Sequence, residues 1–162
     1  MSLGPVMLDL EGQSLTTEET RLLQHPAVGG VILFSRNYSS REQLSDLCSA
    51  IHKLRSPQLL IAVDHEGGRV QRFKEGFTHL PPAAWYGEQF RHNSALGLRL
   101  AEEGGWLMAS ELRACGVDFS FAPVLDVGHG VSQVIGDRAF SRNPDEVSRL
   151  AHAWMKGCHS AG

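Results

Sequence analysis

The stretch "QLLIAVDHEGGRVQR", residues 58–72, passes without a linker from an apolar run into a dense group of ionisable side chains. Its first part is almost continuous in Leu, Ile and Val, which is typical of a parallel strand buried on both faces. Three further apolar runs end in the same way, in polar or glycine-rich segments, at residues 5–10, 28–37 and 117–126. The sequence therefore predicts four strands, each followed by a polar turn.

Helical patterns alternate with these strands. Apolar spacing predicts helices over residues 16–24, 40–54 and about 94–114, and a last helix that opens at "NPDE". Thr16 with Glu19, and Ser39 with Glu42, have the spacing of a capping box. Asn143 is a suitable N-cap before the proline of "NPDE".

The repeated order of strand and helix predicts an α/β fold with right-handed crossovers. Two architectures satisfy this order: a doubly wound sheet, or part of a (β/α)8 barrel. A barrel usually needs about 250 residues, so 162 residues would cover roughly its first half. No linker or low-complexity stretch is visible, and residues 1–162 are therefore predicted to belong to one domain.

Composition narrows the class of protein. The chain is 42% hydrophobic with a formal net charge of -3, so neither nucleic acid nor an anionic membrane is an expected partner. Three cysteines without a CxxC pair predict reduced thiols and a cytoplasmic location. No stretch approaches the ~20 apolar residues that span a bilayer. The opening "MSL" is of the kind that an expression vector adds.

Asp64 is the first candidate for a functional residue. It closes an apolar strand, where a carboxylate is costly unless it faces a cleft or meets a cation. Gly67 and Gly68 allow a sharp turn, and Arg69 and Arg72 can bind carboxylates or hydroxyl groups with several donors. The alternative is a purely structural Asp–Arg pair.

Other strand ends carry weaker candidates. The loop at residues 128–146 contains Arg138, which either points inward or is solvated. Asp9 and Asp126 either cap turns or take part in a site, and Arg36 with Asn37 is expected to shape a loop. A metal site would draw on Asp9, Asp64, His65, Asp126 and His129, but no HxH or HExxH pattern occurs, and no metal is predicted.

Several long motifs in one order identify a family. The chain closely resembles the bacterial β-N-acetylhexosaminidases of glycoside hydrolase family 3 in the following segments: "GPVMLDLEG", "HPAVGGVILFSRNY", "AVDHEGGRVQRFKEGFTHLPP", "EEGGWLMASEL", "DFSFAPVLDVG" and "IGDRAFSRNP". The resemblance runs from Gly4 to Gly162. It implies a (β/α)8 TIM-type barrel that releases terminal β-linked N-acetylglucosamine from muropeptides in peptidoglycan recycling, with retention of configuration and without a cofactor.

The resemblance also assigns roles to residues. The aspartate of the "VD-x-EGGRVQR" motif binds sugar hydroxyls in that family, which carries over to Asp64. The second arginine of the motif matches Arg72, and the arginine of the "IG-acidic-R" loop matches Arg138. His65 stands where many relatives have glutamine, a change that we expect the site to tolerate.

The residues that perform the chemistry in that family do not occur in these 162 residues. Relatives carry a Lys-His-Phe-Pro-Gly-His-Gly segment with the acid/base histidine, and later a Ser-Asp-Asp motif with the aspartate nucleophile. We therefore expect no catalytic residue in this chain, no turnover by the isolated chain, and self-association through an open half-barrel. The alternatives are a sugar-binding half-barrel without catalysis and, less favoured, a metal-dependent barrel hydrolase.

Overall fold

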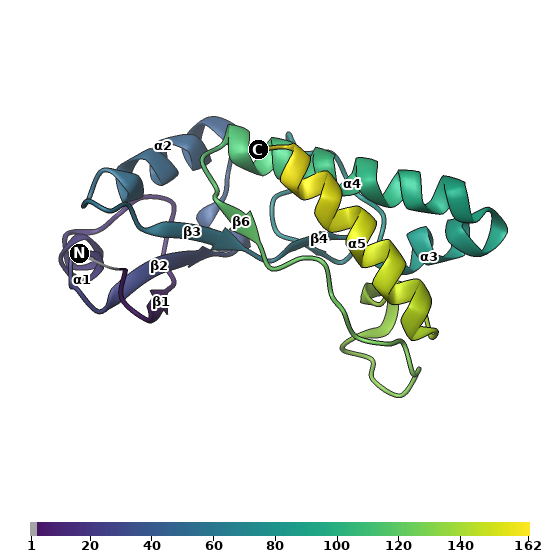
Figure 1. The fold of residues 1–162 in the computed structure, drawn as a ribbon. Helices are drawn as coiled ribbons and strands as arrows, with labels where there is room; N and C mark the ends of the chain where they lie inside the picture. The colour runs from purple at the N-terminus through teal and green to yellow at the C-terminus, as the bar shows by residue number, and fades with distance from the viewer. Residues whose placement is uncertain (1–2) are drawn as a thin grey trace. The chain divides into compact units, whose positions relative to one another are not determined.

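The computed structural model describes residues 3–162, so the first two residues of the proposed vector-derived opening lie outside it. Figure 1 labels most of the helices and strands along the chain. Their bounds are β1 Val6–Leu8, α1 Thr17–Leu23, β2 Val28–Leu33, η1 Ser35–Asn37, α2 Arg41–His52, β3 Leu60–Val63, β4 His65–Gly67, β5 Val70–Gln71, α3 Ala83–His92, α4 Ser94–Ala114, β6 Phe119–Ser120, η2 Gly136–Arg138 and α5 Pro144–Ser160. Within residues 3–162, no helix is both long and apolar enough to cross a bilayer.

The chain forms two compact units and passes between them several times. The first unit contains the residues up to Asp64, Arg72–Phe77 and Leu112–Ser120, and the second contains His65–Gln71, Thr78–Glu111 and Phe121–Gly162. Each unit is built from three segments that are distant in the sequence. No cut at one point of the chain would separate them, and the assignment of residues 1–162 to one domain stays a prediction.

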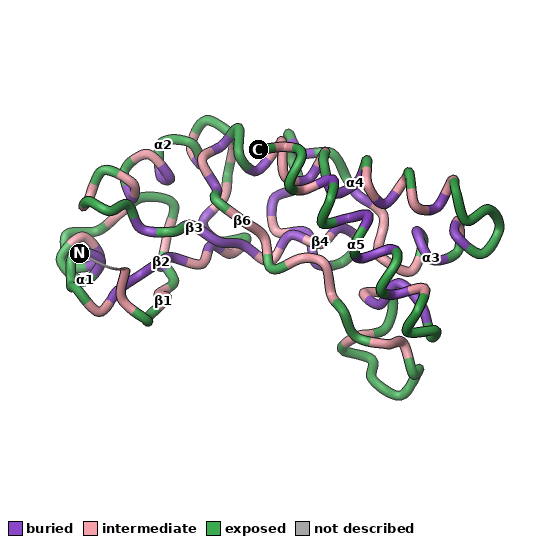
Figure 2. Tube along the Cα trace, viewed as in Figure 1, coloured by how far each residue is buried: buried purple, intermediate pink, exposed green. Residues whose placement is uncertain are grey.

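The first unit is built on a four-stranded parallel sheet with the order β1-β2-β3-β6. Strands β2 and β3 lie side by side (Figure 1), and most of their residues are buried (Figure 2). In the centre, Val31 of β2 pairs with Ile61 of β3, and both residues are fully buried. Burial on both faces explains why these two strands are almost continuous apolar runs. The predicted α/β class is confirmed, whereas closure into a barrel stays a prediction.

The helices of the first unit begin close to their predicted positions. Thr16 caps α1, and its hydroxyl accepts the Glu19 N–H at 3.1 Å while the Glu19 carboxylate accepts the Thr16 N–H at 2.7 Å. The predicted cap of α2 was one residue too early, because Ser40 and not Ser39 accepts the N–H of the third helical residue, Gln43, at 3.1 Å. Two adjacent serines offer the same chemistry, and only the backbone path decides which one caps.

The second unit contains the β4–β5 hairpin and the helices α3, α5 and most of α4. Its core is aromatic: the ring centroids of Tyr86 and Trp154 lie 5.4 Å apart, and those of Phe140 and Trp154 lie 6.3 Å apart, in edge-to-face arrangements. Asn143 caps α5 by accepting the Asp145 N–H at 2.9 Å, as predicted. The hairpin and α3 were not predicted from the sequence.

Candidate functional site

Asp64 directly follows β3, whose last three residues are buried. Its carboxylate accepts a hydrogen bond from Nη2 of Arg72 at 3.3 Å, and each of the two side chains is 30% exposed. The Arg72 guanidinium also lies over the ring of Phe34, 5.8 Å from its centroid. The structure thus brings together two of the three residues expected to bind substrate, at the carboxyl end of a buried strand.

This pair can serve either as a structural ion pair or as a recognition site. A partly exposed ion pair contributes little to stability, because water screens it and because ordering two side chains costs entropy. Because both side chains are partly exposed, the Asp64 carboxylate and the Arg72 guanidinium can give up their mutual contact and bind hydroxyl groups of a ligand instead. A carboxylate accepts and a guanidinium donates charge-assisted hydrogen bonds, and both suit a ligand rich in hydroxyls.

The strand end after β1 is occupied by contacts within the protein. Arg36 forms an ion pair with Asp9 and donates from Nε to the Leu10 carbonyl at 2.8 Å. Asn37 is fully buried and donates to the carbonyls of Leu10 and Gly12 at 3.0 and 2.7 Å. Arg36 and Asn37 therefore shape a loop, in line with the prediction.

Arg138, the third expected substrate-binding residue, belongs to the second unit. Its Nε and Nη2 atoms donate to the two carboxylate oxygens of Glu66 at 2.9 and 2.6 Å. The Glu66 side chain is 9% exposed and that of Arg138 is 24% exposed. Glu66 lies in the glycine-rich motif that follows the buried strand, and that position was the one signal in the sequence for this residue. It predicted only a supporting role.

The two glycines after Glu66 make this placement possible. Gly67 and Gly68 have φ angles of +92° and +55°, a region that disfavours other residues. A Cβ on Gly67 would stand 2.6 Å from the Pro81 carbonyl oxygen, and the Gly68 N–H donates to Leu80 at 2.8 Å. The predicted sharp turn is confirmed, and it forms the hairpin between β4 and β5.

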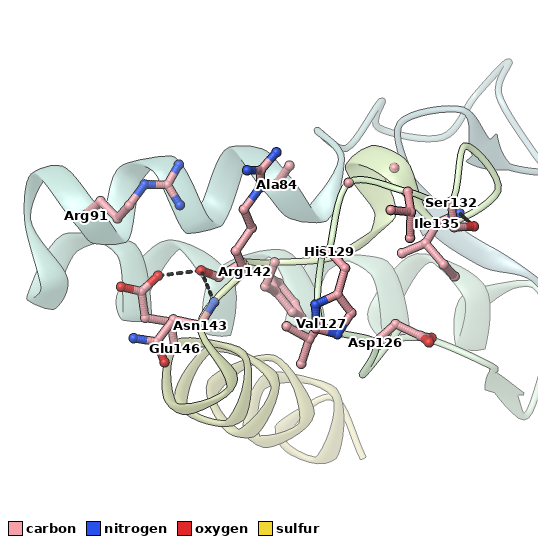
Figure 3. A pocket seen from close by; sticks show the side chains of 17 residues that line it. Ala84, Arg91, Asp126, Val127, His129, Ser132, Ile135, Arg142, Asn143 and Glu146 are labelled. Atoms are coloured by element: carbon pink, nitrogen blue, oxygen red, sulfur yellow. Dashed lines mark hydrogen bonds between the residues drawn. The ribbon is translucent and has the colours of Figure 1, made fainter.

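A cavity of about 710 Å³ lies elsewhere in the second unit (Figure 3). Its polar side chains include Arg91 of α3, Asp126 and Arg142 of the loop before α5, and Glu146 of the first turn of α5. Glu146 accepts a hydrogen bond from the Ser141 hydroxyl at 2.6 Å. None of the three expected substrate-binding residues lines this cavity, so its size alone does not make it the sugar site.

The residues weighed as metal ligands do not gather. Over residues 3–162, no group of three or more His, Cys, Asp or Glu side chains is arranged to hold a metal ion. Asp9 is engaged with Arg36 and Asp64 with Arg72.

The fold and the site define a class of protein: a parallel α/β domain with a carboxylate–guanidinium pair at the carboxyl end of a buried strand, where α/β proteins bind their ligands. The family is settled by comparison. Residues 6–162 match the family model described as the glycosyl hydrolase family 3 N-terminal domain, and the chain belongs to this family.

Individual relatives agree with this assignment. The chain is 67% identical over 162 residues to a β-hexosaminidase from Thioalkalivibrio sulfidiphilus and 60% identical to one from Alkalilimnicola ehrlichii, covering all of this chain and 47% of each relative. The crystal structure of native NagZ from Neisseria gonorrhoeae is 49% identical, with a TM-score of 0.98 over all of this chain and 48% of that one. The chain thus spans about half the length of these relatives.

Proposed function

We propose that this chain supplies the sugar-recognition part of a β-N-acetylhexosaminidase, which removes terminal non-reducing β-linked N-acetylglucosamine from muropeptide fragments with retention of configuration. The observation that carries the proposal is the Asp64–Arg72 pair, partly exposed to solvent at the end of a buried strand in a chain of this family. The names of the relatives and a NagZ crystal structure in complex with N-trifluoroacetyl-D-glucosamine support the same substrate class.

In this proposal the two side chains exchange partners when sugar binds. Asp64 accepts hydrogen bonds from sugar hydroxyls, and Arg72 donates to hydroxyl oxygens. Arg138 is assigned to sugar binding by the resemblance of its "IG-acidic-R" loop to the family, and it donates hydrogen bonds. Correct orientation of a bound sugar ring can lower a barrier by several kcal/mol in favourable cases.

Bond cleavage needs other groups. A retaining glycosidase uses a nucleophile and a general acid/base, and the two carboxyl groups of the usual pair are about 5–5.5 Å apart. We assign neither role to any of these 162 residues, and we expect both to come from the part of the relatives' length that this chain does not span. The 162-residue chain alone therefore binds sugar without cleaving it.

The cytoplasm is the proposed compartment, with peptidoglycan recycling as the process served. Burial raises the pKa of the Cys48 thiol to about 12 and that of Cys158 to about 11. At neutral pH both thiols are protonated and unreactive; Cys48 is a small apolar group of the core, and Cys158 is partly buried. This use of cysteine fits a reducing compartment.

The test compares the purified 162-residue chain, verified by intact mass, with the gene product that carries it. A chromogenic β-N-acetylglucosaminide reports turnover, and protein NMR titration with N-acetylglucosamine reports binding. We expect saturable binding by both proteins and turnover by the gene product alone. Wild-type-like cleavage by the 162-residue chain would contradict the division of roles, binding without turnover by both would favour the non-catalytic alternative, and loss of turnover with a chelator would favour a metal-dependent enzyme.

A further inference from the structure

Two ion pairs of opposite polarity connect the β4–β5 hairpin with the loop before α5. Glu66 of the hairpin holds Arg138 of the loop at 2.6 Å, and Arg69 of the hairpin holds Asp137 of the loop at 3.0 Å. All four residues belong to the second unit. Each segment thus contributes one acid and one arginine, and neighbouring loop residues are held by opposite charges.

Backbone contacts reinforce this arrangement. Nη2 of Arg69 donates to the Gln133 carbonyl at 3.1 Å, and Nη1 of Arg138 donates to the Val134 carbonyl at 3.3 Å. Between β6 and α5 the loop has no regular structure except the three residues of η2. A long irregular loop lacks the regular backbone hydrogen bonds that would hold its side chains in place. The contacts with Arg69 and Arg138 hold this loop instead.

The geometry of Glu66 separates positioning from direct sugar contact. Both of its carboxylate oxygens accept hydrogen bonds from Arg138, and its side chain is only 9% exposed. Arg138 is more exposed, at 24%, and so remains accessible to a ligand. A bidentate carboxylate fixes both the position and the plane of a guanidinium, which a single hydrogen bond does not.

We propose that Glu66 is a positioning residue, which holds the Arg138 guanidinium in the orientation that binds sugar. This inference rests on the proposed function, because it assigns Glu66 a role through a residue of that site. An arginine side chain loses rotamer entropy when it is ordered. Glu66 orders Arg138 before the ligand arrives, so sugar binding does not bear that cost.

A double-mutant cycle tests the inference in the gene product that carries this chain. The variants are Glu66→Gln, Arg138→Ala and the two combined, with kcat and KM measured on a chromogenic β-N-acetylglucosaminide. We expect Glu66→Gln to lower kcat/KM about 10- to 100-fold, the scale found for side chains that orient the ligands of metal centres. In the Arg138→Ala background the same change should have no further effect, because Glu66 then has nothing to position.

Controls separate this role from a purely structural one. Glu102→Gln removes an equally charged partner of Lys156, 2.7 Å away in the same unit, and should leave kcat/KM unchanged. Glu66→Asp keeps the negative charge and replaces Glu66→Gln if the latter variant does not fold. It should retain more activity than Glu66→Gln. Full additivity of Glu66→Gln and Arg138→Ala would overturn the positioning role. Wild-type activity in Arg138→Ala, or no turnover by the wild-type gene product, would instead overturn the proposed site or function on which the inference rests.

A chemical readout in the 162-residue chain does not depend on activity. Phenylglyoxal modifies accessible guanidinium groups, and peptide mass spectrometry resolves Arg138 from Arg69 when cleavage falls between them. We expect Glu66→Gln to speed modification of Arg138 at least severalfold, whereas Glu102→Gln should leave it unchanged. An unchanged rate at Arg138 in Glu66→Gln would show that Glu66 does not hold the guanidinium.

Discussion

Asp64 and Arg72 neutralise each other in the absence of ligand. Their 30% exposure makes the pair weak in energy but easy to open, which suits a recognition site better than a structural brace. A fully buried pair would resist opening, because removing or separating either charge leaves the other without compensation. The partial exposure is thus the feature that distinguishes the two interpretations of this pair.

Substituting Asp64 with asparagine should weaken sugar binding more than it changes stability. The amide keeps the shape but loses the charge that strengthens hydrogen bonds to hydroxyl groups. We expect at least a tenfold loss of N-acetylglucosamine affinity in an NMR titration, with the unfolding midpoint almost unchanged. Asp9→Asn, which alters a similar ion pair with Arg36, is the matched control and should leave affinity intact. Equal losses in the two variants would argue against the role of Asp64.

Glu19 gives a prediction for the pH dependence of stability. Burial of its carboxylate would raise its pKa, but hydrogen bonds from the Glu11 and Thr16 N–H groups outweigh this and hold the pKa below the ordinary value of a glutamate. Because the folded-state pKa is lowered, the contribution is present at neutral pH and is lost as the pH falls below about 5. Glu19→Gln should therefore lower the free energy of unfolding by about 1 kcal/mol at pH 7, the scale of a net hydrogen-bond contribution, and the difference should shrink in urea titrations at acidic pH. A constant difference at all pH values would contradict this.

The candidate site was partly predictable at the level of single residues. Asp64 was a candidate because a carboxylate at the end of an apolar strand is costly without a partner. Arg72 and Arg138 were candidates as well, and the resemblance gave all three a substrate-binding role. The partner of Arg138 did not follow from the sequence, because Glu66 lies 72 residues away in the chain. Pairings of that separation depend on how the segments fold together, which no local pattern records.

At the scale of elements, α4 and α5 approach so closely that only glycine fits between them. A Cβ on Gly157 would stand 1.9 Å from the carbonyl oxygen of Glu102, and one on Gly105 would stand 2.2 Å from that of Trp154. Both obstacles are backbone atoms, which cannot move aside as a flexible side chain can. The two glycines therefore set the distance between these helices.

Gly157→Ala should destabilise the protein strongly. Overpacking usually costs about 1–3 kcal/mol, and we expect the upper end or more, because the helices must separate to admit the methyl group. Urea unfolding followed by tryptophan fluorescence measures the loss, with buried Trp154 as a reporter. Gly12→Ala is the control: nothing lies within 4 Å of its added Cβ, and its stability should change little. Similar losses in both variants would contradict the close-packing argument.

The elements that the sequence predicted are those with a strong periodic pattern. Long amphipathic helices and continuous apolar strands can be recognised from the sequence. The helices α1, α2, α4 and α5 lie close to their expected ranges. The β4–β5 hairpin was missed because its strands have three and two residues, too short to show a period. Helix α3 was missed because Pro82 precedes it without a side-chain cap.

At the scale of the whole molecule, the described sheet is open. Across residues 3–162, β1 and β6 each pair on one side only. Val6 on β1 is 41% exposed, and Val131 and Val134 in the loop before α5 are 89% and 68% exposed. Unpaired strand edges and exposed apolar side chains are ready surfaces for association.

The 162-residue chain should therefore self-associate in solution. Size-exclusion chromatography with light scattering, over a range of protein concentrations, should show a mass above 17.7 kDa that falls on dilution. Val131→Ser combined with Val134→Ser should shift this equilibrium towards monomer, because both side chains are exposed and not part of the core. A concentration-independent monomer would contradict the prediction.

The sequence by itself determined the α/β class, the position of the central strands and Asp64 as a residue that needs a partner. These follow from local physics: apolar periodicity, capping chemistry and the cost of a carboxylate at the end of a buried strand. Only the tertiary structure decided that Arg72 is that partner, that Glu66 forms a bidentate ion pair with Arg138, and that glycines set the spacing of α4 and α5. Each of these depends on distances between segments far apart in the chain, and such distances are fixed by packing of the whole and not by the residues on either side.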